Sequence, residues 1–345
     1  MCRIVPLIIV AVLGSVRPAA ATPADHLPPH IRQITKFGER AEFSHDGRRI
    51  LFLSKQFGDV MEYDIETGVI SCLSQHFKHH GFNRALYLHN GDILVTGPDK
   101  TFDLKDKAAR TYARLHATSW VLDKSGVKPL MPLGITMEEG PAVSRTRPLI
   151  AWTHDPEPQS PDRPQTRISL GELAFVDGVP AMVNVRQILK AADFPEGQRP
   201  VKIETQNFVP PGDKQLTVSA FEIEGTANTD GFLFDIDTGT LSNFTKSPDH
   251  FEEVEGVFPD GRSTTVERNE HNGIRAPMAD CWRVWFDGSR EPQRLTRFLE
   301  HAGFKATNPV ISDDGRLMAF QLGKANDEAG VGYGLFLMDL TQAPQ

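Results

Sequence analysis

The sequence predicts an all-β protein, a six-bladed β-propeller whose blades are four-stranded antiparallel sheets. Three observations predict this fold. The 345 residues include 28 glycines and 25 prolines, which are too many chain breakers for long helices. A motif that contains an Asp-Gly pair recurs roughly every 45–55 residues, a spacing typical of propeller blades. A segment near the N-terminus also resembles the one strand that the last repeat lacks.

Each repeat begins with two strands joined by a tight turn. Three copies are clear, in residues 43–54, 257–267 and 310–320, and each contains an Asp-Gly pair followed by Arg. Asp-Gly supplies the positive φ angles that a two-residue hairpin turn requires. Weaker copies lie in residues 88–93 and 211–214, and a degenerate copy in residues 144–148 completes the set of six.

A second pair of strands follows each hairpin. The clearest third strands, with the turns that follow them, are residues 61–65 before Thr67-Gly68, residues 232–236 before Thr238-Gly239, and residues 282–286 before Asp287-Gly288. The repeating unit therefore has four strands. Six units result, and they begin near residues 40, 82, 141, 204, 251 and 305.

The last unit ends one strand short, because the chain stops soon after its third strand in residues 333–340. Residues 32–37 match residues 293–298, which form the fourth strand of the fifth unit. We therefore expect the N-terminal strand to pair with the last blade and close the ring, which removes exposed sheet edges. Residues 22–345 would then form a single propeller domain.

Residues 1–21 have the pattern of a secretory signal peptide. Arg3 precedes an apolar run in residues 4–14, and Ala19-Ala20-Ala21 is a small-residue cleavage site. The run is shorter than the roughly 20 apolar residues that span a bilayer, and no later segment is apolar for that length. We expect cleavage after Ala21 and a periplasmic or secreted protein with no membrane span. The alternative is an uncleaved anchor.

Charge and cysteine content exclude other classes of protein. The formal net charge of −8 becomes −10 when cleavage removes Arg3 and Arg17, and an acidic surface is unsuited to nucleic acid. Cys72 and Cys281 then remain, in different repeats. We expect two buried free thiols rather than a disulfide, and a monomeric protein.

The repeat resembles that of the TolB-like β-propeller family. That family's pattern, Phe-Ser-x-Asp-Gly-Lys/Arg-x-Ile-x-Phe and later Arg-Leu-Thr, is carried by residues 43–52, 310–320 and 287–296. The resemblance implies the propeller fold over nearly the whole mature chain. TolB itself is a periplasmic partner of an outer-membrane lipoprotein and has an α/β domain before its propeller, which we do not expect here. Propellers of this type also resemble oligogalacturonate lyase, which has a His-rich metal site.

The two faces of the predicted propeller differ in loop length. The Asp-Gly turns lie on one face, and long links lie on the other, in residues 97–113, 154–165, 188–200, 222–229, 268–279 and 322–332. Long loops in a compact domain are usually functional, so we expect the site on this loop face. Eight of the 12 histidines also map there: His76, His79, His80, His116, His154, His250, His271 and His301.

Three histidines directly precede innermost strands and are candidate metal ligands. We expect His80, His250 and His301 to approach the central axis from three blades. Converging imidazoles with carboxylates suit one divalent metal ion or acid–base catalysis. The alternative is that they are separate, solvated loop histidines, and no compact metal-binding motif such as His-Glu-x-x-His decides between the two.

Other side chains on the loop face are candidates for binding and catalysis. Glu252 or Glu253, together with Lys305, would move protons and hold a substrate acid. The candidate ligand-binding residues are Arg84, Glu139, Trp152, His154, His271 and Lys324. Arg84 and Lys324 suit a carboxylate, whereas structural ion pairs are the alternative. Trp152 would pack between blades or edge the pocket.

Two functions remain open. The first is a binding module that takes a protein or a carbohydrate-like ligand on its His-rich loop face, and we favour it because a metal-binding motif is missing. The alternative is a metal-assisted lyase or hydrolase that acts on a carbohydrate-like substrate, as the resemblance to oligogalacturonate lyase implies. A fold alone does not choose between them.

Overall fold

The computed structural model describes residues 21–126, 128–138, 140–154, 166–248, 250–270, 278–326 and 328–343. Residues 1–20 of the predicted signal peptide lie outside the described residues. In the described part of the chain, twenty-four strands make up nearly all of the regular structure. The prediction of an all-β protein is therefore confirmed.

The first three sheets each contain four antiparallel strands that pair in chain order. The first comprises β2 (Glu39–Phe43), β3 (Arg49–Leu53), β4 (Val60–Asp64) and β5 (Ile70–Cys72). The second comprises β6 (Arg84–Tyr87), β7 (Ile93–Gly97), β8 (Ala117–Leu122) and β9 (Met131–Met137). The third comprises β10 (Ala142–Val143), β11 (Leu149–His154), β12 (Arg167–Val176) and β13 (Val179–Lys190).

The next two groups of four strands follow the same pattern. The fourth comprises β14 (Lys202–Phe208), β15 (Gln215–Phe221), β16 (Thr229–Asp235) and β17 (Leu241–Asn243). The fifth comprises β18 (His250–Val257), β19 (Ser263–Glu270), β20 (Asp280–Trp285) and β21 (Gln293–Arg294). One parallel pair, Thr229 with Phe251, joins these two groups.

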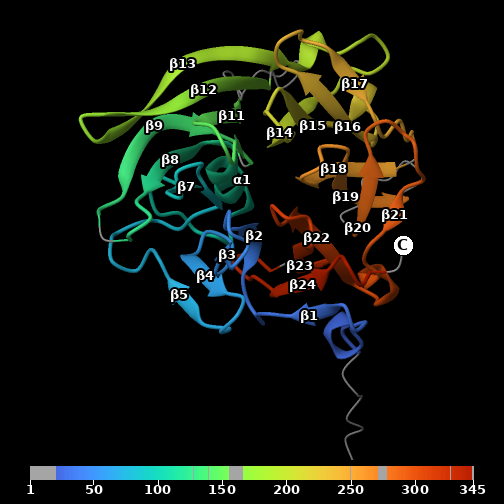
Figure 1. The fold of residues 1–345 in the computed structure, drawn as a ribbon, viewed down its shortest axis with the longest axis horizontal. Helices are drawn as coiled ribbons and strands as arrows, with labels where there is room; N and C mark the ends of the chain where they lie inside the picture. The colour runs from blue at the N-terminus through green and yellow to red at the C-terminus, as the bar shows by residue number, and fades with distance from the viewer. Residues whose placement is uncertain are drawn as a thin grey trace, which may run out of the picture.

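The sixth sheet combines both ends of the chain. It comprises β22 (Phe304–Ile311), β23 (Leu317–Lys324), β24 (Leu335–Asp339) and β1 (Ile31–Gln33). β1 is antiparallel to β24, with Ile31 opposite Met338 and Gln33 opposite Phe336. This is the pairing that the match between residues 32–37 and 293–298 predicts. Figure 1 shows the six groups arranged around a central axis, with β1 beside β24.

The apolar core lies mainly between neighbouring sheets. Phe43 and Phe52 of the first sheet pack with Leu335 and Leu337 of the sixth, and all four are buried. Leu51 and Leu53 pack on the opposite side with Phe82 and Val95 of the second sheet. Because successive strand residues point to opposite faces, one strand such as β3 supplies both layers.

The hairpins at the Asp-Gly pairs are longer than the predicted two-residue turns. The Ser44 backbone N–H donates to the Arg49 carbonyl at 2.9 Å, so four residues, 45–48, form the loop. The Asp46 side chain accepts from the Ser44 hydroxyl and from the Arg48 N–H, at 2.6 and 3.1 Å. Gly47 has the positive φ that the sequence predicts, at 67°. Side-chain bonds stabilise this wider loop, which a dipeptide signal alone does not reveal.

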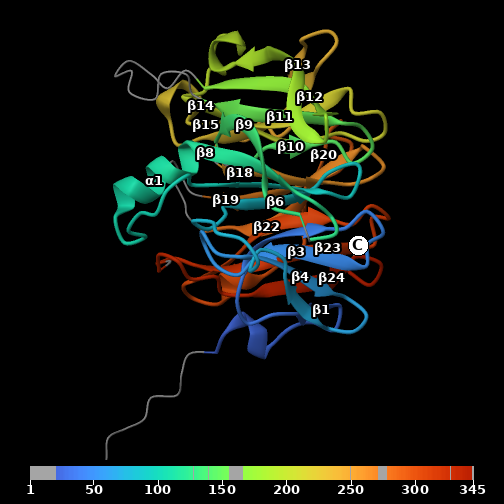
Figure 2. The same cartoon turned by 90° about the vertical axis from the view of Figure 1, so that its left-hand side faces the viewer.

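One helix lies in a link that the sequence analysis treats as a loop. Helix α1 (Lys107–Leu115) follows Asp106, whose side chain accepts from the Ala108 and Ala109 N–H groups at 2.9 and 3.1 Å. Figure 2 shows α1 projecting from one side of the molecule, and we call that side the loop face. Four short 3-10 helices also occur: η1 (Pro23–Asp25), η2 (Ala191–Asp193), η3 (Ile223–Gly225) and η4 (Phe298–Glu300).

Cys72 and Cys281 are both free thiols, as expected. Cys281 is buried, whereas Cys72 is partly exposed. No helix within the described residues has the length and apolar character needed to cross a membrane.

The contact of β1 with β24 should contribute measurably to stability. Ile31 is 6% exposed and packs in the apolar cluster that contains Phe336 and Met338. We expect Ile31→Ala to lower the free energy of unfolding by about 2–5 kcal/mol, because it removes buried methyl groups and leaves a cavity. Urea denaturation measures this difference. Val176→Ala, at a site that is 57% exposed, should cost less than about 0.5 kcal/mol. Equal effects of the two substitutions would contradict the pairing.

Candidate functional site

Charged side chains gather where the innermost strands begin, on the loop face. Each of the six sheets contributes at least one, from its innermost strand or from the residues just before it: Arg40, Arg84, Glu138, Glu204, Glu253 and Lys305. Several of them act electrostatically on one another. Glu204, Lys202 and Arg114 all shift the pKa of Glu253, and Arg84 lowers that of Arg40. We call the central region that the six innermost strands surround the channel. Its loop-face end is therefore one connected charged region.

A polar cavity of about 330 Å³ opens in this region, between α1, the innermost strands of the first, fifth and sixth sheets, and residues 328–333. We call it the loop-face cavity. Its four cationic side chains are Arg40, Arg110, Arg114 and Lys305. Its four acidic side chains are Glu39, Glu253, Glu267 and Glu328. Tyr333 adds an aromatic ring to the wall.

Three glutamates of the fifth sheet lie close together beside this cavity. Glu253 on β18 is directly opposite Glu267 on β19, and Glu255 follows on β18. Asn308 of β22 connects two of them, since its backbone N–H donates to Glu267 Oε1 at 2.8 Å and its amide to Glu255 Oε1 at 3.2 Å. Glu255 and Glu267 are buried and Glu253 is half-buried, so the three neighbouring carboxyl groups cannot all be ionised without a large cost.

The pKa values of these glutamates are raised accordingly. Burial is the main cause that raises the pKa of Glu253 to about 8, and the charges of Glu267 and Glu204 raise it further. Burial is the cause that raises the pKa of Glu267. The pKa of Glu255 is raised well above its ordinary value, mainly by burial and further by the charges of Glu267 and Glu253. Glu253 therefore holds a proton at neutral pH.

Arg40 of the cavity is cationic at neutral pH. Burial is the main cause that lowers the pKa of Arg40, to about 9, so this guanidinium is still protonated at neutral pH. Arg40 has a positive φ of 59° in a β-bulge, and its backbone N–H donates to Gln321 Oε1 at 2.6 Å. Arg40 Nε also forms an ion pair with Glu39 Oε1 at 3.8 Å. With Glu253 protonated, four cationic side chains face three other acidic ones in the cavity, and this excess of positive charge favours an anionic ligand.

The three predicted metal ligands lie in different surroundings. His80 is exposed, and its Nδ1 is 2.9 Å from Thr101 Oγ1. His301 Nδ1 is 3.4 Å from the Ala21 carbonyl. His250 begins β18 and pairs with Glu270 at the end of β19. Among the residues that the structure describes, no group of three or more His, Cys, Asp or Glu side chains is placed to hold a metal ion. The described residues therefore do not fit the metal site that the resemblance to oligogalacturonate lyase implies.

The predicted catalytic residues separate into two groups. Glu253 and Lys305 both line the loop-face cavity. Glu252 alternates to the other face of β18, where it is 1% exposed and its Oε1 is 3.3 Å from Arg268 Nε. Burial is the main cause that raises the pKa of Glu252. The structure thus assigns Glu252 an ion pair and places Glu253 beside the cavity.

The predicted ligand-binding residues are also dispersed. Arg84 begins β6 and interacts electrostatically with Glu255. Trp152 is buried in the apolar cluster of the second and third sheets, and His154 Nε2 is 2.9 Å from Ser169 Oγ. Lys324 Nζ lies 4.4 Å from the centre of the Tyr333 ring. Glu139 and His271 lie outside the described residues.

Several residues of the cavity are missing from the sequence-based prediction. Arg40, Arg110, Arg114, Glu267 and Asn308 all line it. The nearest signal in the sequence is the group Glu252, Glu253 and Glu255 in one innermost strand, since acidic residues rarely lie in inner strands without a reason, and Glu267 lies opposite Glu253. No comparable local signal marks Arg110 and Arg114, whose position depends on where α1 packs.

The raised pKa of Glu253 predicts a specific pH dependence of stability. Its pKa is about 8 in the folded protein and about 4.3 in an unfolded chain, so folding favours the protonated form. The stability that the protonated Glu253 carboxyl contributes to the folded protein is fully present below a pH of about 4.3 and is lost as the pH rises through about 8. We expect Glu253→Gln to gain stability relative to the parent protein over this range, by up to about 1.4 kcal/mol per pH unit.

Urea denaturation at several pH values measures that difference. Glu196→Gln, at an exposed site, serves as the control and should show no such trend. A difference between Glu253→Gln and the parent protein that does not change with pH would contradict the assignment.

Comparisons with known proteins support the fold. No protein family profile matches this chain, and no curated protein matches it in sequence. Solved structures do match. TolB from Acinetobacter baumannii is 11% identical with a TM-score of 0.52, over 87% of this chain and 65% of that one. The chain thus spans just under two thirds of the length of that TolB.

Two enzymes match similarly. Oligogalacturonate lyase in complex with manganese is 12% identical with a TM-score of 0.53, over 91% of this chain and 79% of that one. A gluconolactonase from Xanthomonas campestris is 14% identical with a TM-score of 0.54, over 95% of this chain and 99% of that one. At these identities the likeness concerns the fold alone. The chain therefore has the β-propeller fold that TolB and oligogalacturonate lyase share.

Proposed function

We propose that this chain is an exported β-propeller that binds a small, carboxylate-bearing, carbohydrate-like ligand in the loop-face cavity. One observation carries the proposal: four cations from three structural elements surround a polar cavity whose acidic side is partly protonated at neutral pH. A volume of about 330 Å³ suits a ligand of one or two sugar rings rather than a protein segment.

The chemistry of the wall fits such a ligand. The carboxylate would contact Arg114 of α1 and Lys305 of β22, since guanidinium and ammonium groups form strong charge-assisted bonds with carboxylates. Hydroxyl groups need both donors and acceptors, which the amides of Gln321 and Asn308 supply. Tyr333 offers an apolar ring face to a sugar ring.

Export is the second part of the proposal. It rests on Arg3, the apolar run in residues 4–14 and the Ala19-Ala20-Ala21 site. The mature protein would begin at Thr22. N-terminal sequencing of the protein recovered from outside the cytoplasm tests this, and a chain that retains residues 1–21 would contradict it.

A second candidate function is acid–base catalysis on the same ligand. It is favoured by Glu253, whose pKa of about 8 suits proton transfer near neutral pH and which shares the cavity with Lys305. In its ionised form Glu253 would take the proton next to the uronate carboxylate and pass it to the departing glycosidic oxygen, so that the bond from the sugar ring to that oxygen breaks as a carbon–carbon double bond forms. Incubation with an oligogalacturonate and ultraviolet detection of the new conjugated double bond tests this activity. Product formation that persists in Glu253→Gln would contradict the role of Glu253.

Binding can be tested with two matched sugars. Galacturonate and galactose share one ring and differ in the carboxylate. We expect galacturonate to bind at least about tenfold more tightly by calorimetry, because only its carboxylate meets the arginines and the lysine. Arg114→Gln and Lys305→Gln should each weaken galacturonate binding by about tenfold and leave galactose nearly unchanged.

Lys107→Gln is the matched control, because Lys107 is exposed on the same helix and does not line the cavity. It removes one positive charge from α1 and should change the affinity by less than about twofold. Equal binding of the two sugars, or no saturable binding of either one, would contradict the proposal.

A further inference from the structure

Each hairpin between the first two strands of a sheet is closed by a backbone hydrogen bond, but the hairpins differ in length and in the residue at the tip. Four of them enclose four residues, as in Ser44 to Arg49, Ser144 to Leu149 and Ser312 to Leu317, at 2.9, 2.9 and 3.0 Å. Leu88 to Asp92 encloses three residues, and Val209 to Gln215 encloses five. The first residue that each hairpin encloses varies from sheet to sheet: His45, His89, Arg145, Pro210, Pro259 and Asp313. Each sheet therefore presents a different side chain at this face.

A second cavity lies among these tips, at the end of the channel opposite the loop face. We call it the turn-face cavity. It measures about 400 Å³, and residues from all six sheets line it. More of its surface is apolar than polar, and its apolar wall includes Leu86, Val143, Phe208, Val257 and Ile311. Cavities of this size with an apolar wall and few polar groups are typical of small-molecule sites.

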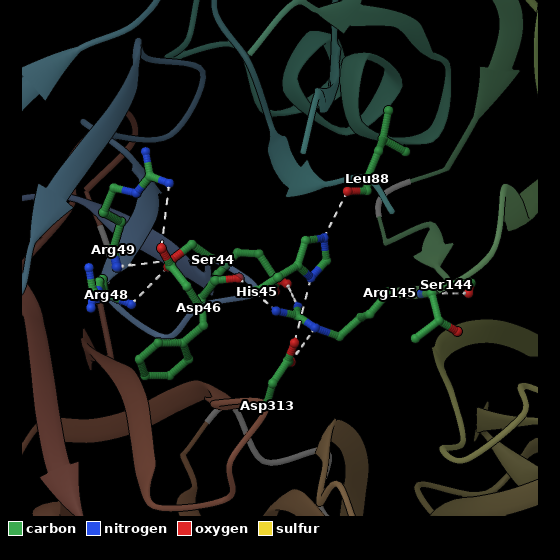
Figure 3. A network of polar contacts seen from close by, with 12 residues as sticks. Ser44, His45, Asp46, Arg48, Arg49, Leu88, Ser144, Arg145 and Asp313 are labelled. Atoms are coloured by element: carbon green, nitrogen blue, oxygen red, sulfur yellow. Dashed lines mark hydrogen bonds and ion pairs between the residues drawn. The ribbon is translucent and has the colours of Figure 1, made fainter. Parts of the chain in front are cut away.

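The polar groups of the turn-face cavity form one network (Figure 3). Arg145 Nη1 donates to Glu42 Oε1, its Nη2 donates to the Phe43 carbonyl at 2.9 Å, and its Nε forms an ion pair with Asp313. His45 Nδ1 is 3.5 Å from the same Asp313 carboxylate, and its Nε2 is 2.8 Å from the Leu88 carbonyl. Figure 3 shows the Arg145 side chain lying between His45 and Asp313.

Negative charge exceeds positive charge in this network. Glu42 and Asp313 share the single guanidinium of Arg145, and the Asp213 carboxylate, which also lines the cavity, accepts from the Ser144 hydroxyl at 2.5 Å. Burial is the main cause that raises the pKa of Glu42, and the charge of Arg145 opposes this shift. The Asp313 side chain remains 35% exposed and open to the cavity.

We propose that the turn-face cavity binds a small organic cation, with an apolar body against Phe208 and Val143 and an ammonium or amidinium group at Asp313. The cation would supply the positive charge that the network lacks, and burial of the apolar body would supply most of the affinity. The site is independent of the function proposed for the loop-face cavity, because the two cavities lie at opposite ends of the channel and share no lining residue.

Three probes of one shape test the proposal. Benzylammonium, benzyl alcohol and benzoate each carry one aromatic ring and differ in charge. Calorimetry or ligand-detected NMR compares them at about pH 8, above the ordinary range of a histidine. This pH is chosen because the hydrogen bond with Asp313 raises the pKa of His45, and a protonated His45 would compete with the ligand for that carboxylate. We expect benzylammonium to bind at least about tenfold more tightly than benzyl alcohol, and benzoate to bind most weakly. No saturable binding of benzylammonium would overturn the proposal. Tighter binding of benzoate that is lost in Val143→Trp, and so occurs in the turn-face cavity, would also overturn it.

Two substitutions locate the site. Asp313→Asn should reduce the preference for benzylammonium over benzyl alcohol to about twofold or less, while benzyl alcohol still binds and so reports an intact cavity. Val143→Trp should abolish binding of both probes because the indole fills the cavity. Asp237→Asn is the control, since Asp237 is 68% exposed, lies outside this cavity and should leave every affinity unchanged. A preference for the cation that survives Asp313→Asn would overturn the assignment.

Discussion

The antiparallel pairing of β1 with β24 is the contact on which the arrangement of the channel depends. Without it, the sixth sheet would end in an exposed edge at β24, and the cluster around Phe336 and Met338 would lose Ile31. The innermost strand of that sheet, β22, carries Lys305 and Asn308. Asn308 in turn bonds Glu255 and Glu267 of the fifth sheet. The pairing of two segments about 300 residues apart therefore completes the sheet that supplies Lys305 and Asn308 to the polar cavity.

The same six innermost strands give the channel two chemically different ends. Four of them carry a β-bulge near the middle, at Arg40, Gln206, Glu255 and Asn308. A bulge adds one residue and changes the direction of the side chains, so an apolar strand can present charged groups at one end only. The Asn207 amide also donates to the Glu255 carbonyl, which links the fourth and fifth sheets between the two cavities. The loop-face cavity is consequently polar, and the turn-face cavity is mainly apolar.

The sequence allows the sheets to be predicted, and the site only in part. Asp-Gly pairs and alternating strands are local signals, and the match of residues 32–37 with residues 293–298 even predicts the partner of β1. The position of a residue before a strand shows where the chain approaches the axis, but not where its side chain points. Glu252 and Glu253 demonstrate the difference, because adjacent strand residues face opposite sides and only Glu253 reaches the cavity.

Other functional groups depend on packing that no local pattern encodes. Asp106 is a recognisable helix cap, yet the direction in which α1 presents Arg110 and Arg114 follows from tertiary contacts. Arg145 stands where the repeat is degenerate, so a search for the repeat discards it. The departure from the pattern is what places this arginine between Glu42 and Asp313.

A crystal structure of the mature protein with bound galacturonate would show whether the loop-face cavity is the ligand site. We expect the sugar in this cavity, with its carboxylate within hydrogen-bond distance of Arg114 and Lys305 and its ring beside Tyr333. A sugar bound elsewhere, or one in the cavity with its carboxylate turned toward solvent, would contradict this expectation.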